Sequence, residues 1–63
     1  MNREEARIFD TLLRRRRKAR DAGVMAYANG LELEDNPLQP GETGYENWIT
    51  GFMETKRHAE GAD

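Results

Sequence analysis

The residues best suited to bind another molecule form a basic run in the N-terminal part of this 63-residue chain. Its members are five arginines and one lysine: Arg14, Arg15, Arg16, Arg17, Lys18 and Arg20. The planar guanidinium of arginine contacts two phosphate oxygens at once, and its flat face stacks on an unpaired base. The run therefore predicts a nucleic-acid contact made by these side chains.

The alternative interpretation of the basic run is a solvated helix face whose charges are paired with nearby acids. The acids within reach along the sequence are Glu4, Glu5, Asp10 and Asp21. Four adjacent arginines repel one another, and these acids are too few to neutralise them. Nucleic-acid contact is favoured, and the solvated face stays open as the alternative.

Charge is distributed unevenly along the chain. Residues 1–20 hold eight basic and three acidic side chains, whereas the whole chain has a net charge of −2. The first 20 residues therefore carry +5 and the remainder −7. This polarity indicates that one end meets an anionic partner while the other end keeps the protein soluble or selects among partners.

Residues typical of a catalytic or metal site are scarce. His58 is the single histidine, and it has no cysteine or serine partner at a recognisable spacing. The acidic group Glu32, Glu34 and Asp35 lacks the glycine and the final glutamate of a calcium-binding loop. We expect the chain not to be an enzyme and to use no metal and no cofactor.

Composition also bears on location. The chain has no cysteine, which fits a reducing compartment. Its first residues, Met1 to Glu5, are followed by no apolar stretch long enough for a signal peptide or a membrane span. We expect a soluble cytoplasmic protein with neither a membrane nor a small-molecule substrate as partner.

Capping signals predict where the helices begin and end. Asn2 and Glu5 have the spacing of a capping box, so a first helix is expected over about 3–29, with Gly30 ending it. Both prolines fall in the next segment, which predicts an extended loop over 31–43. Thr43 and Glu46 form a second capping-box pattern, which predicts a shorter helix over about 44–59.

Each predicted helix has one face suited to pack on the other. With successive residues about 100° apart, the first helix carries a stripe rich in small residues in its second half. This stripe consists of Ile8, Phe9, Leu12, Ala19, Gly23, Ala26, Tyr27 and Gly30. The second stripe is bulkier and consists of Tyr45, Trp48, Ile49, Phe52 and Met53.

Packing of these stripes predicts an all-α fold, a two-helix hairpin in a single small domain over 1–63. Glycines inside helices usually mark a close approach, so Gly23, Gly30 and Gly51 are expected where the two helices meet. Trp48 and Phe52 are expected in the core rather than as base-stacking platforms. The loop residues Leu31, Leu33 and Leu38 are expected to cover its open side.

The first helix is longer than the second, and its N-terminal part extends beyond the predicted hairpin. Phe9 and Leu12 are therefore expected to be partly exposed. Residues 1–18 form a basic helical extension that could be flexible in the free protein and become ordered on contact with a partner.

The pattern Gly23-x2-Ala26-x3-Gly30-x6-Pro37, followed by Trp48-Ile49-Thr50-Gly51-Phe52, resembles the ribosome modulation factor family. Members of that family are small bacterial proteins of two helices joined by an extended loop, and the resemblance covers residues 19 to 55. The residues that match its signature are Gly23, Ala26, Gly30, Pro37, Trp48, Gly51 and Phe52. Most of these residues match positions that maintain the fold.

The resemblance implies ribosome hibernation in stationary phase or stress. It implies binding to the small ribosomal subunit near the 3′ end of its rRNA, repression of translation, and no catalysis. The alternative is a non-enzymatic protein-binding module, either a dimer formed through Phe9 and Leu12 or an inhibitor that uses the acidic second half as its surface.

Overall fold

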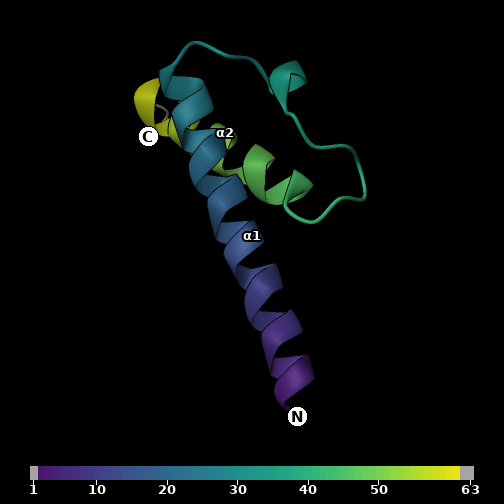
Figure 1. Cartoon of the computed structure of the whole chain (residues 1–63). Coiled ribbons are helices and arrows are strands. Elements are labelled where there is room, and N and C mark those ends of the chain that lie inside the picture. Colours follow the sequence, from purple (N-terminus) through teal and green to yellow (C-terminus); the bar gives the residue numbers. More distant parts are fainter. Residues whose placement is uncertain (1, 62–63) are drawn as a thin grey trace.

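The computed structural model describes residues 2–61, and within them the fold is all-α. Helix α1 (Arg3–Ala28) is followed by a single 3₁₀ turn, η1 (Leu33–Asp35), and then by helix α2 (Tyr45–Ala59). Figure 1 shows α2 packed against the C-terminal half of α1, while the N-terminal half projects beyond it. The predicted two-helix fold, with a long first helix and a shorter second one, is confirmed.

Both ends of α1 have the caps that the sequence predicts. The backbone N–H of Glu5 donates to the Asn2 side chain at 2.8 Å, and the Glu5 carboxylate accepts from the N–H of Asn2. At the other end Gly30 has a φ of 80°, the left-handed conformation that glycine adopts without strain. The N–H of Leu31 donates to the Ala26 carbonyl at 2.9 Å, which completes a Schellman motif.

The start of α2 differs from the prediction. Gly44 is the N-cap, with a φ of 96° and no side-chain cap, so the helix begins at Tyr45 and the capping box predicted for Thr43 is wrong. The cause is tertiary contact: Gly44 is buried against α1, and a Cβ on it would lie 2.8 Å from that of Ala19. Close packing at this point requires glycine, which displaces the threonine cap.

The core consists of two aromatic side chains from α2 on small residues of α1. Trp48 and Phe52 are stacked with ring centroids 5.4 Å apart, and Trp48 is 2% exposed. They cover Ala19 and Ala26, which are also buried, while Tyr27 meets Phe52 edge to face. The predicted stripes therefore pack together over the second half of α1.

Two glycines allow the helix backbones to meet. A Cβ added to Gly23 would overlap the carbonyl oxygen of Trp48, and one added to Gly51 would overlap that of Arg20. The close approach predicted for these two positions is confirmed. For Gly30 it is wrong, because nothing lies within 4 Å of a Cβ there, and its positive φ is what requires glycine.

Residues early in α2 contact residues early in the second half of α1, and later residues of α2 contact later residues of α1. Gly44, at the start of α2, lies beside Ala19. The last turn of α2 lies beside Tyr27, whose hydroxyl donates to Glu60 at 3.4 Å. The helices therefore cross in the same general direction, so the connecting segment must return along α1 before α2 can begin. This geometry explains the length of the loop, which arches back in Figure 1.

The returning loop is held by one asparagine. The Asn36 side chain donates to the Tyr45 carbonyl at 3.3 Å and accepts from the N–H of Leu38 at 3.0 Å. Leu38 packs on the core as predicted, but Leu31 and Leu33 are exposed, so the prediction that they cover the hairpin is wrong. Local bonds shape η1 instead, since the Asp35 carboxylate accepts from the N–H of Glu32 at 2.8 Å.

Candidate nucleic-acid interface

The basic run lies where the projecting N-terminal part of α1 joins the part that α2 covers. Gly44, the cap of α2, lies against Arg15 and Ala19, and Figure 1 shows the N-terminal turns of α1 extending away from the hairpin. All six predicted binding residues are exposed: Arg14, Arg15, Arg16, Arg17, Lys18 and Arg20. The helix therefore presents its cations to solvent.

Two of these six cations have carboxylate partners. Arg14 pairs with Asp10 one turn earlier at 3.0 Å, with both side chains mostly exposed. Arg20 pairs with Glu54 of α2 at 2.5 Å, so it links the two helices. Exposed pairs of this kind contribute little to stability.

The other four basic residues, from Arg15 to Lys18, have no carboxylate within 4 Å among residues 2–61. Local pairing, the alternative interpretation of the run, therefore involves Arg14 and Arg20 and leaves the middle of the run unneutralised. The structure brings the cations together along about two successive turns of one helix.

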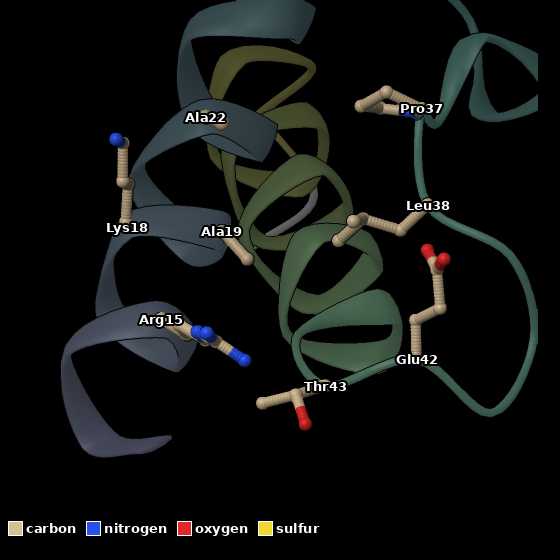
Figure 2. Close-up of a pocket in the computed structure, with 8 residues that line it drawn as sticks. All are labelled: Arg15, Lys18, Ala19, Ala22, Pro37, Leu38, Glu42 and Thr43. Carbon is tan, nitrogen blue, oxygen red and sulfur yellow. The ribbon is translucent and has the colours of Figure 1, made fainter. Parts of the chain in front are cut away.

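An apolar groove, which was not predicted from the sequence, adjoins the basic run. It has a volume of about 470 Å³ and lies between α1 and the loop that returns along it. Its lining residues, drawn in Figure 2, are Arg15, Lys18, Ala19, Ala22, Pro37, Leu38, Glu42 and Thr43. Of the loop residues that line the groove, Pro37 alone belongs to the set that matches the family signature.

The polar groups of the groove lie at its rim. Figure 2 shows the Arg15 guanidinium turned toward Thr43, whereas the Lys18 ammonium points away from the loop. Glu42 stands opposite, and its carboxylate accepts from the backbone N–H of Gln39 at 2.8 Å. The groove thus combines apolar walls with one cation, one carboxylate and one hydroxyl, a set that suits a flat, partly polar ligand.

Tyr27 lies at the far end of α1, and its hydroxyl has a raised pKa. Partial burial of its ring and the neighbouring Glu60 carboxylate raise the pKa of the hydroxyl above its ordinary value of 10.0. The phenol is therefore neutral at physiological pH, and it adds no charge to the surface.

Residues suited to other kinds of site are dispersed. His58 is exposed near the end of α2, and the Asp35 carboxylate is engaged in capping η1. Within residues 2–61, no three histidine, aspartate or glutamate side chains gather where they could hold a metal ion. In the same range, neither helix has the length and apolar composition needed to cross a membrane.

Comparisons with protein-family models, with curated proteins and with solved structures find no match for this chain.

Proposed function

We propose that the chain is a ribosome-associated regulator of the ribosome modulation factor type. It binds rRNA of the small ribosomal subunit through α1 and represses translation in stationary phase or under stress. The observation that carries this proposal is the exposed basic run of α1, where Arg15 to Lys18 have no carboxylate partner among residues 2–61.

The side chains of the run have different directions and so different roles. At about 100° per residue, Arg14, Arg17 and Lys18 point away from the apolar stripe and are placed to contact backbone phosphates. Release of counterions from the RNA is the main source of affinity in such contacts, so binding depends steeply on salt.

Arg15 and the groove supply a place for an unpaired base. Proteins recognise single-stranded RNA by stacking splayed bases on flat side chains and by bonding their polar edges. A base in the groove would lie against Ala22 and Pro37, with Arg15 beside its phosphate and Glu42 near its amino groups. This arrangement favours RNA with exposed single-stranded segments over a uniform duplex.

The charge on the rest of the chain determines how the protein is oriented on the RNA. Residues 21–63 carry −7, which repels phosphates from α2 and the loop. Only α1 then faces the RNA, while the acidic hairpin points away from it. The hairpin serves to hold α1 and to form one wall of the groove.

The proposal is tested by sedimenting the protein with small ribosomal subunits at low salt. Arg14, Arg15, Arg16 and Arg17 are replaced together by glutamine, which keeps the length of helix and removes four charges. We expect cosedimentation to be lost, because the counterions are no longer displaced.

The matched control removes the same number of charges elsewhere, by changing Arg3, Arg7, Lys56 and Arg57 to glutamine. We expect this variant to keep most of its binding. Circular dichroism of both variants verifies that the helices are intact. Undiminished cosedimentation of the first variant would refute the proposal.

A further inference from the structure

The projecting half of α1 exposes large apolar side chains on the face that α2 covers further along. Ile8 is 62% exposed and Phe9 is 54% exposed, while Leu12 is half-buried. Soluble monomers expose single apolar residues routinely, but three on one helical face form a contiguous patch. Gly44, the cap of α2, meets α1 at Arg15 and Ala19, beyond Ile8 and Phe9, and in Figure 1 no other element of the described chain lies beside the N-terminal turns of α1.

Charges flank this patch in a self-complementary order. At about 100° per residue, Glu5 lies on the same face one turn before Ile8, and Arg15 and Arg16 lie one turn after Leu12. The face therefore reads acid, apolar, apolar, base along the helix. In a second copy that runs antiparallel to the first, the basic residues of this face lie opposite the acidic residue of the first copy.

We propose that two copies of this chain associate through antiparallel contact of their α1 helices over residues 5–16. In this register the patch of one copy covers that of the other, and Glu5 of each copy faces Arg15 and Arg16 of its companion. The contact is isologous, as in most two-fold dimers, since the same surface serves both copies. Its centre lies near Asp10, which points away from the contact.

The hairpin leaves room for this arrangement. Each α1 is covered by its own α2 along its second half and by the α1 of the second copy along its first half. The shared segment is about 18 Å long at 1.5 Å per residue, which is short for a stable interface. The dimer is therefore reversible and forms at high protein concentration.

Self-association does not rest on the proposed RNA contact, and the two share Arg15, which also lines the groove. Arg14, Arg17 and Lys18 lie on the side of α1 opposite the dimer contact, so a dimer presents two outward rows of cations. The pairing of Glu5 with Arg15 and Arg16 neutralises charges that otherwise repel on the inner side.

The test is sedimentation equilibrium of the purified full chain, without RNA, over a wide range of concentration. The wild type should change reversibly from monomer to dimer. Replacing Glu5 by arginine, or Arg15 and Arg16 together by glutamate, sets like charges opposite one another and should weaken the dimer about tenfold or more. Combining all three substitutions restores opposite charges and should return the dimer to near wild-type strength.

The matched control changes Arg17 and Lys18 to glutamate, the same change of charge on the outward face, and should leave dimerisation as it is. Circular dichroism of each variant reports whether α1 remains helical, since Glu5 also caps it. A wild type that is monomeric at every concentration would overturn the inference. So would a combined variant that dimerises no better than its parents. Because no RNA is present, these results are independent of ribosome cosedimentation.

Discussion

At the scale of single residues, two glycines and two aromatics determine how the helices meet. Gly23 and Gly51 bring backbone against backbone, and Trp48 and Phe52 fill the space on either side. These positions could be predicted from the sequence, because a glycine inside a helix is costly unless another surface approaches closely. Gly44 could not, since its role depends on Ala19, a residue 25 positions earlier.

Replacing Gly23 with alanine should destabilise the fold strongly. The added Cβ overlaps the Trp48 carbonyl, and neither backbone can move without separating the helices. We expect the free energy of unfolding to fall by about 2 kcal/mol or more, despite the better helix propensity of alanine. Urea unfolding followed by the fluorescence of Trp48 measures the change.

Gly30 offers the matched control for this substitution. Alanine there meets nothing within 4 Å and is penalised only by its positive φ, so we expect a loss of about 1 kcal/mol. If both variants lose the same stability, the close approach at Gly23 is not what holds the helices together.

At the scale of elements, the ends of α1 are determined by local interactions, whereas the path of the loop is not. Asn2, Glu5 and Gly30 lie within a few residues of what they bond, so the bounds of α1 could be predicted closely. The loop returns along α1 because the helices cross in the same direction, and no local pattern encodes that direction. The positions of Leu31 and Leu33, and the groove beside α1, depend on it.

The groove can be filled by one substitution. Ala22 is an exposed lining residue on α1, and leucine at this position would occupy the space between the helix and Pro37. We expect about tenfold weaker binding to a single-stranded RNA, because an inserted base would lose its stacking surface. Fluorescence anisotropy with a labelled oligonucleotide measures the affinity.

The same change at Ala28, which is exposed on α1 but does not line the groove, should leave the affinity unaltered. Binding to duplex RNA should be unchanged in both variants, since it uses phosphates alone. Equal single-strand affinity for the Ala22→Leu and Ala28→Leu variants would remove the groove from the RNA site.

At the scale of the whole molecule, an elongated shape is combined with a separation of positive from negative charge. The molecule measures 45 × 24 × 16 Å, and its long dimension is the helix α1, which carries the basic run where α2 begins to cover it. The separation of charge could be read from the sequence, since residues 1–20 and 21–63 have opposite sign. The exposure of the run could not be predicted from the sequence, because it depends on where α2 crosses α1.

The salt dependence of binding to small ribosomal subunits tests the central claim most directly. If α1 contacts about four phosphates, the logarithm of the association constant should fall against the logarithm of salt with a slope of about −3 to −4. Each arginine of the run replaced by glutamine should reduce that slope by nearly one. A slope near zero, or one that these substitutions leave unchanged, would contradict the assignment of α1 as the RNA-binding element.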